Sequence, residues 1–240
     1  MSPKSPQFTE PKKAPILGVL GGLGPPTTAK LYLQLVKALT VGGNRPQICV
    51  WNVAVNESAE RDFIEHGGSR AHFVQKLQEG ARALERSGCD LIIVPCNTVH
   101  VLLADVQQAV SVPILNMVAL TAREVLQRGW SSVLLLATST TVATRLYQNE
   151  LQNHGVEVVV PKSFDQSRID RAVLSLINGR GIDEARRLLR AVVSRSKTQG
   201  IVLGCTDLQM VLSEDDRTVD SVQSLMRAVV SCWEKRSEAL

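Results

Sequence analysis

Two cysteines in this chain each end an apolar segment and are followed by small polar side chains. The segments are LIIVPCNTVH (91–100) and GIVLGCTDLQ (200–209). Their polar residues are Cys96, Asn97, Thr98 and His100 in the first segment and Cys205, Thr206 and Asp207 in the second. A thiol in such surroundings can act as a redox group, a nucleophile or a proton carrier.

The spacing of the two cysteines favours proton transfer among these three chemistries. Redox pairs usually lie close together as CxxC, whereas Cys96 and Cys205 are far apart in the sequence. A single nucleophile needs no equivalent partner. Two thiols on opposite faces of one carbon can remove a proton from one side and return it from the other. The N–H groups of the helices that follow each cysteine would favour the thiolate, so we expect one thiolate and one thiol near neutral pH.

The elements that must position these thiols alternate along the chain between strands and helices. The expected strands are 16–22, 48–55, 91–95, 133–137, 156–160 and 201–204. The expected helices are 26–39, 69–87, 121–128, 141–153, 168–178, 183–197 and a last one from 222. This alternation predicts βαβ crossovers and parallel sheets.

A faint internal repeat divides the chain into two related halves. TAKLYLQ (28–34) is similar to ATRLYQ (143–148), and LIIVPCNT (91–98) is similar to GIVLGCTD (200–207), in the same order. Each half would place one cysteine at the carboxyl end of a parallel strand, where ligands bind in α/β sheets. We therefore expect both thiols to face one cleft between the halves.

The composition excludes several classes of protein. Of the 240 residues, 44% are hydrophobic and 21% charged, the net charge is +4, and the basic residues form no block. This predicts a globular protein that binds no nucleic acid, and no apolar run is long enough to span a membrane. The five cysteines show no CxxC spacing, so we expect free thiols and a cytoplasmic location rather than disulfides or zinc. Residues 1–15, rich in proline and lysine, read as a disordered lead-in.

Two turns are candidate anion sites. The loop GGLGPP (21–26) could offer backbone N–H groups such as that of Gly22 to a carboxylate, and ATSTT (137–141), with Thr138, occupies the matching turn of the second half. Ordinary turn chemistry explains both segments equally well. The spacing is not the GxGxxG of dinucleotide sites.

The segments GVLGGLGPPTT, PCNTVH and GCTDL, in this order and spacing, resemble the cofactor-independent aspartate/glutamate racemase superfamily, and most closely its aspartate racemase branch. The resemblance covers nearly all of residues 16–235. It implies two pseudosymmetric α/β domains, each a mostly parallel sheet flanked by helices, with the active site between them. Residues 16–115 with 211–240 would form the first domain, and 116–210 the second.

The same resemblance implies an amino-acid racemase that acts on aspartate, or else on glutamate, without pyridoxal phosphate, metal or other cofactor, and that forms a homodimer. Cys96 and Cys205 would be the two proton carriers. The motif positions that would hold the substrate are Asn97, Thr98, Thr206 and Asp207. These side chains could instead only cap the helices that follow, and His100 could either orient the first thiol or serve the fold.

The chain departs from the family pattern where the side chain of an acidic substrate would bind. The aspartate branch has an arginine after a proline-rich loop, but here the region reads NVAVNESAERDFIEHGG, and Arg61 is the nearest candidate. A family lysine falls at Ser167, with Arg168 and Lys162 as nearby substitutes. In Asp207 the chain has the shorter acid where the branch usually has Glu. The two-thiol chemistry is unaffected by these changes, whereas the side-chain specificity is left open.

Two other functions remain open from the sequence. A related isomerase or decarboxylase, of the maleate or arylmalonate type, could use the same cleft without a symmetric exchange of protons. A relative that binds a ligand without turnover would be a regulatory or binding protein on the same scaffold.

Overall fold

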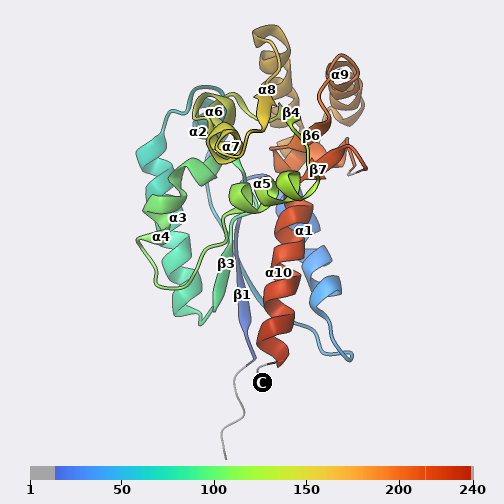
Figure 1. Ribbon diagram of the computed structural model, residues 1–240. Helices are drawn as coiled ribbons and strands as arrows, with labels where there is room; N and C mark the ends of the chain where they lie inside the picture. The colour runs from blue at the N-terminus through green and yellow to red at the C-terminus, as the bar shows by residue number, and fades with distance from the viewer. Residues whose placement is uncertain (1–13, 214, 239–240) are drawn as a thin grey trace, which may run out of the picture.

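The computed structural model describes residues 14–213 and 215–238, so most of the predicted lead-in, residues 1–13, lies outside the described residues. The chain forms two parallel sheets, one in each lobe of the molecule (Figure 1). Helices cover both faces of each sheet. The predicted α/β class, with two mostly parallel sheets flanked by helices, is confirmed.

The first sheet has the order β2-β1-β3, and all its strands are parallel. The strands are β1 (Ile16–Gly21), β2 (Gln47–Asn52) and β3 (Leu91–Ile93). Successive side chains of β1 point to opposite faces. Leu17 and Val19 pack against α1 (Pro25–Leu39) and α10 (Ser221–Glu238), whereas Ile16 and Leu20 pack against α3 (Arg70–Arg86).

The second sheet has the order β5-β4-β6-β7 and is also parallel throughout. The strands are β4 (Ser132–Leu136), β5 (Glu157–Val159), β6 (Gly200–Leu203) and β7 (Thr218–Asp220). Its flanking helices are α5 (Met117–Gln127) and α7 (Leu146–Gln152) on one face and α8 (Ser163–Ile177) and α9 (Ile182–Ser194) on the other. In both sheets the first strand of the half lies inside the sheet, and the strand that leads to a cysteine pairs with it in parallel. The internal repeat predicts a cysteine after a parallel strand in each half.

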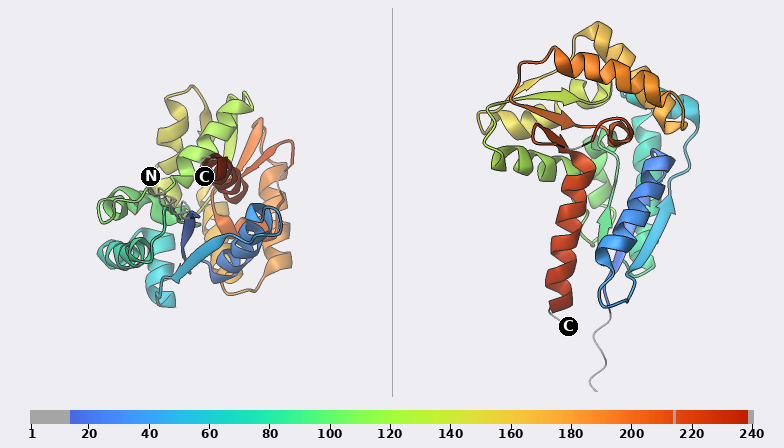
Figure 2. Two further views of the ribbon diagram at one scale, coloured as in Figure 1. Left: turned by 90° about the horizontal axis from the view of Figure 1, so that it is seen from below. Right: turned by 90° about the vertical axis from the view of Figure 1, so that its right-hand side faces the viewer.

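The chain returns from the second lobe to the first at its last strand. β7 pairs with β6, so residues 218–220 belong to the second sheet. The predicted boundary at 211 had placed these residues in the first domain. The long helix α10 then runs back along the first lobe and packs on α1 and α5 (Figure 2). Its apolar residues, such as Val222, Leu225 and Val229, are buried in the core of the first lobe.

Short elements lie at the carboxyl ends of the strands, where the lobes meet. They are η1 (Thr98–Leu102), α6 (Ser139–Ala143), η2 (Thr206–Met210) and α2 (Glu57–His66). Helix α4 (Leu103–Gln107) follows η1 and packs on α3. The sequence predicted one helix over 141–153, but Arg145 takes a left-handed conformation with φ 57° and divides it into α6 and α7. Helix α2 was not predicted, and it contacts α6 and α8 of the second lobe.

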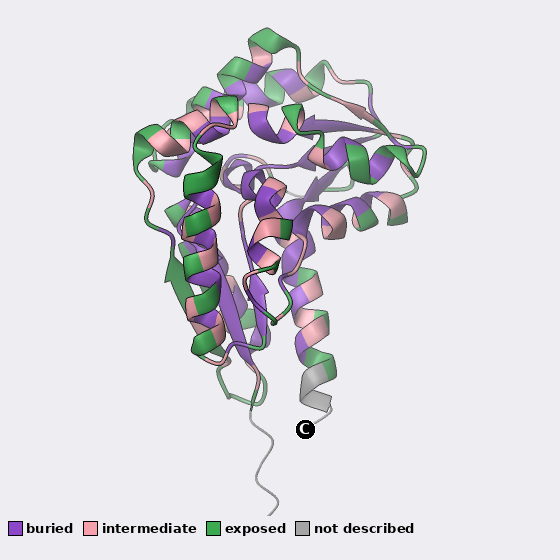
Figure 3. Cartoon of the chain, turned by 90° about the vertical axis from the view of Figure 1, so that its left-hand side faces the viewer, coloured by how far each residue is buried: buried purple, intermediate pink, exposed green. Residues whose placement is uncertain are grey.

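Burial follows this plan: the strands of both sheets are largely buried, whereas the outer faces of the helices are exposed (Figure 3). The exceptions are two edge strands: β2, on which Val50 and Trp51 are exposed, and β5, which has no buried residue. Within the described residues, no helix has both the length and the apolar character needed to cross a lipid bilayer.

Candidate active site

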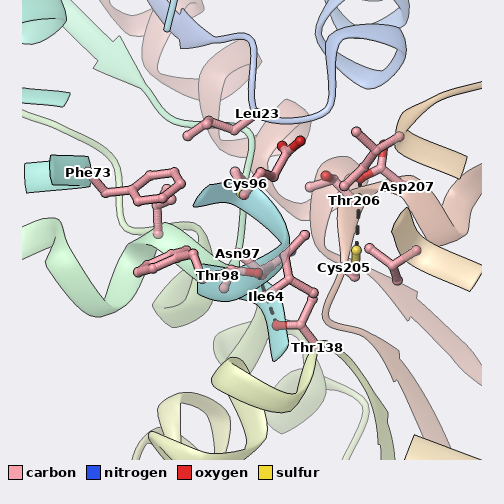
Figure 4. Close-up of a pocket in the computed structure, with 15 residues that line it drawn as sticks. Leu23, Ile64, Phe73, Cys96, Asn97, Thr98, Thr138, Cys205, Thr206 and Asp207 are labelled. Carbon is pink, nitrogen blue, oxygen red and sulfur yellow. Dashed lines mark hydrogen bonds between the residues drawn. The ribbon is translucent and has the colours of Figure 1, made fainter. Parts of the chain in front are cut away.

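The two thiols line one pocket between the lobes (Figure 4). Cys96 follows β3 and Cys205 follows β6, and each of these strands is hydrogen-bonded to the central strand of its sheet. Each cysteine is followed by a short 3-10 helix, η1 or η2. The empty space among the pocket's lining residues is about 390 Å³, a figure that includes open solvent.

Burial controls the protonation of both thiols. The backbone N–H groups of Thr98 and Val99 act on Cys96, and those of Asp207 and Leu208 act on Cys205, as the sequence led us to expect. Desolvation is the larger effect, and it raises the pKa of Cys96 to about 12 and the pKa of Cys205 well above its usual value. Both thiols are therefore protonated at neutral pH in the free protein, which corrects the expectation of a standing thiolate.

Two carboxyl groups lie beside the thiols. Thr27 Oγ1 donates a hydrogen bond to Asp207 Oδ1 at 2.7 Å, and the Cys205 sulfur lies 4.0 Å from Asp207 Oδ2. Burial raises the pKa of Asp207 to about 6. Burial, followed by the charge of Asp207, raises the pKa of Glu60 to about 7. When these carboxyl groups ionise they give the pocket negative charge, which no described lysine or arginine lining it offsets.

The loop after β1 leaves room for Asp207. Gly24 has φ 90°, and a Cβ at this position would lie 2.9 Å from Asp207 Oδ1. Only glycine satisfies both the left-handed backbone and this close approach. The neighbouring Gly22 has no such role in the pocket, because it is not among the lining residues and its N–H donates to Thr28 Oγ1 at 3.0 Å.

Asn97 connects the first thiol segment to the second lobe. Its Oδ1 accepts a hydrogen bond from the Tyr147 hydroxyl at 2.5 Å, and its Nδ2 donates to Ser221 Oγ at 2.8 Å. It stands at the N-cap position of η1 but makes no capping bond. Both ends of the amide are thus held by buried groups, so Asn97 fixes the backbone beside Cys96. Only its second amide hydrogen and the second lone pair of Oδ1 remain for hydrogen bonds to a ligand.

We expect Tyr147→Phe to reduce the free energy of unfolding by about 1–3 kcal/mol, because it leaves the buried Asn97 Oδ1 without this donor. Turnover should fall as well, since Asn97 lies directly beside Cys96. Urea unfolding and steady-state rates measure the two effects. Tyr32→Phe is the matched control, because Tyr32 occupies the equivalent place in the repeat and is 40% exposed. Equal behaviour of the two variants would contradict the role assigned to Tyr147.

Three threonines complete the polar wall of the pocket. Thr98 Oγ1 and Thr138 Oγ1 are hydrogen-bonded across the lobes at 3.1 Å, and Thr206 lines the pocket beside Cys205. Thr138 also caps α6, because its side chain accepts from the backbone N–H of Thr141. Capping and a place in the pocket therefore coexist at Thr138. The hydroxyl groups of the three threonines can accept a hydrogen bond from an ammonium group or donate one to a carboxylate.

His100 serves the fold around the first thiol. Its Nδ1 lies 2.8 Å from the carbonyl oxygen of Cys96, and its Nε2 lies 3.1 Å from the backbone nitrogen of Met117. This pairing requires the neutral tautomer with the proton on Nδ1. Burial lowers the pKa of His100, which agrees with that state. The imidazole thus holds the backbone of Cys96 in place.

The two arginines expected near the substrate lie outside the pocket. Arg61 is exposed on α2, in a surface depression that it shares with Glu57. Arg168 is exposed on α8, where it lies 3.9 Å from Asp165 and over the ring of Phe164. Among the described residues, neither arginine nor lysine lines the pocket of the two thiols.

Sequence reasoning missed much of the pocket wall. Glu60, Phe63 and Ile64 come from α2, the helix that was not predicted. The signals were present: Asn56 caps α2, acidic residues fill its first turn, and Gly67 ends it with φ 70°. The other missed residues are Leu23, Phe73, Val99, Val173 and Ile177. Phe73 lies on the helix predicted over 69–87.

Comparison with known proteins agrees with this architecture. A protein-family model described as Asp/Glu/Hydantoin racemase matches residues 20–230. The broad specificity amino-acid racemase RacX of Bacillus subtilis is 27% identical over 229 residues, which cover 91% of this chain and 98% of that protein.

Solved structures give the same picture. An aspartate racemase homologue from Pyrococcus horikoshii is 28% identical, with a TM-score of 0.70 over 92% of this chain and all of the other. The aspartate racemase of Picrophilus torridus is 24% identical and shares the fold, with a TM-score of 0.77 over 92% and 94% of the two chains. Since the family model spans most of the sequence and both lobes of the fold, the chain belongs to the Asp/Glu/Hydantoin racemase family and is an isomerase of the racemase class.

Proposed function

We propose that this protein racemises a free α-amino acid by exchanging its α-proton between Cys96 and Cys205, without a cofactor. The observation that carries the proposal is the placement of the two thiols. They follow equivalent strands of two related sheets and line one pocket. An α-carbon held between them has one sulfur on each face, which is the requirement for a two-base exchange.

The proton exchange is balanced without a further reactant. One sulfur, as thiolate, takes the α-hydrogen as a proton, and the C–H bonding pair stays on the α-carbon. The thiol on the opposite face gives its proton to that pair. The two sulfurs end the turnover with their protonation states exchanged. After product release the remaining thiolate takes up a proton from solvent and Asp207 releases the one it accepted, which restores the free protein.

The first thiolate requires help, because burial keeps both thiols protonated. Asp207 Oδ2 lies 4.0 Å from the Cys205 sulfur, so its carboxylate is placed to accept the proton of that thiol. The substrate ammonium adds a positive charge beside the sulfurs and favours the thiolate. Activation thus occurs when the substrate binds, and the free protein keeps unreactive thiols.

The polar wall is suited to the α-substituents of the substrate. In this proposal Asp207 and Glu60 receive the ammonium group, and the hydroxyl groups of Thr98 and Thr206 receive the carboxylate together with backbone N–H groups. The homodimer and the cytoplasmic location remain predictions from the sequence. Aspartate, or else glutamate, remains the substrate prediction of the sequence, although no described lysine or arginine in the pocket would pair with its second carboxylate.

The test is proton NMR of L-amino acids in D2O with purified protein and no added cofactor. We expect the α-proton signal of a substrate to disappear while chiral chromatography detects the D-enantiomer. Loss of CO2 or isomerisation of a double bond would instead identify the related decarboxylase or isomerase. Ligand binding without α-proton exchange, for every amino acid tried, would identify a silent relative and contradict the proposal.

A further inference from the structure

The wall of the pocket around the two thiols is mainly apolar. Phe63 of α2 and Phe73 of α3 stack with their ring centroids 4.3 Å apart. Val173 and Ile177 of α8 add aliphatic groups from the second lobe. Leu23, from the loop after β1, and Ile64 complete this apolar wall. These side chains come from both lobes, so they surround the space that a substrate side chain would occupy.

The charges in the pocket have one sign. Its ionisable groups besides the thiols are the carboxyls of Glu60 and Asp207, and no described lysine or arginine lines it. A second carboxylate on the substrate would lose its water among apolar groups and meet two acids without a counter-charge. Aspartate and glutamate therefore fit this pocket poorly.

We infer that the substrate is a neutral α-amino acid with an apolar side chain, which the apolar wall binds while Glu60 and Asp207 take its ammonium group. The inference rests on the proposed racemase function and names the substrate class of the same site. A lysine-like substrate would match the acids by charge. Its side chain, however, would have to place a second ammonium group against the phenyl and aliphatic wall, and the α-ammonium already requires the acids beside the thiols.

The test compares kcat/KM for the α-proton exchange of five L-amino acids: leucine, methionine, aspartate, glutamate and lysine. We expect leucine or methionine to exceed aspartate and glutamate by at least ~100-fold, since an unpaired buried charge is among the most costly changes in a binding site. Aspartate or lysine as the fastest substrate would overturn the inference and leave the racemase function intact. Exchange with none of the five would count against the proposed function itself.

A charge-introducing variant provides an independent check. Ile177→Lys places an ammonium group at the pocket, at the C-terminal end of α8, where a cation is favoured by the helix dipole. The ratio of kcat/KM for aspartate to that for leucine should rise at least ~10-fold, because the substrate carboxylate gains a counter-charge.

The matched control is Asn178→Lys. It adds the same charge one residue further along, at an exposed position outside the pocket, and should leave the ratio unchanged. Thermal unfolding establishes that both variants fold. An unchanged ratio in a folded Ile177→Lys variant would overturn the assignment of the apolar wall to the substrate side chain. The comparison of the five amino acids decides the inference if that variant does not fold.

Discussion

Replacement of either Cys96 or Cys205 by serine is expected to lower kcat for racemisation by at least ~10³-fold in both directions, as general acid–base groups contribute up to ~10⁴-fold. The hydroxyl of serine is a far weaker acid than a thiol, so it cannot supply the base that removes the α-proton. Each variant lacks one of the two proton carriers. Chiral chromatography of reactions started from the L- and the D-enantiomer measures the loss in each direction.

The control for this experiment is Cys232→Ser. Cys232 is a half-buried cysteine of α10 outside the pocket, and its loss should leave racemisation unchanged. Thermal unfolding of the variants separates lost chemistry from lost structure. A Cys205→Ser protein that still interconverts both enantiomers at the full rate would contradict the two-thiol mechanism, and the same holds for Cys96→Ser.

The second large effect concerns the dependence of stability on pH. Burial raises the pKa of Asp207 from 3.8 to about 6, and that of Glu60 from 4.5 to about 7. For both groups the folded state binds its proton more tightly than the unfolded state does. Their contribution to the free energy of unfolding is therefore complete below about pH 4 and is lost as the pH rises through about 6 for Asp207 and about 7 for Glu60.

Asp207→Asn is expected to remove the part of this loss that Asp207 contributes. The amide keeps an oxygen for the Thr27 hydroxyl and never becomes charged, so at pH 8 the variant should exceed the original protein in free energy of unfolding by on the order of 1–2 kcal/mol. At pH 4 the two proteins should be nearly equal. Urea unfolding from pH 4 to 8 measures the difference, and racemisation by the variant should fall, because the acceptor beside Cys205 is lost.

Asp183→Asn serves as the control, because Asp183 is exposed on α9 and its ion pair with Arg186 lies at the surface. Pairs of this kind contribute little to stability. We therefore expect its difference from the original protein to be small and constant with pH. The opposite result would be a variant that loses free energy of unfolding, relative to the original protein, between pH 4 and pH 8. It would show that the fold stabilises Asp207 as a carboxylate and would reverse the expected sign.

The sequence by itself determined the two-sheet plan and the position of the thiols along it. Apolar runs that alternate with amphipathic segments are local patterns, and strand and helix formation follow them closely. The repeat that relates LIIVPCNT to GIVLGCTD predicted that each cysteine follows the carboxyl end of a parallel strand, as the structure has it. The N–H groups that act on each sulfur also follow from the local chain.

The tertiary structure decided everything that depends on distant segments. Burial by both lobes raises the pKa of Cys96 and Cys205 by more than the neighbouring backbone N–H groups lower it. The extent of this burial depends on distant segments and cannot be read from a local sequence pattern. Asn97 is held by Tyr147 and Ser221, which are remote in sequence, and His100 is held by the backbone of Met117. Their roles in the fold could not be separated from roles in catalysis until these partners were known.

The same reason explains the pocket wall and the substrate inference. Helix α2 carries Glu60, Phe63 and Ile64 into the pocket because it packs on α6 and α8 of the other lobe, whereas Arg61, one residue from Glu60, points to the surface. On a helix, adjacent residues point about 100° apart, so proximity in sequence to an expected arginine says little about the site. The order of residues led to the prediction of a two-thiol proton exchange, whereas the charge and shape of the pocket wall came from packing between the two lobes.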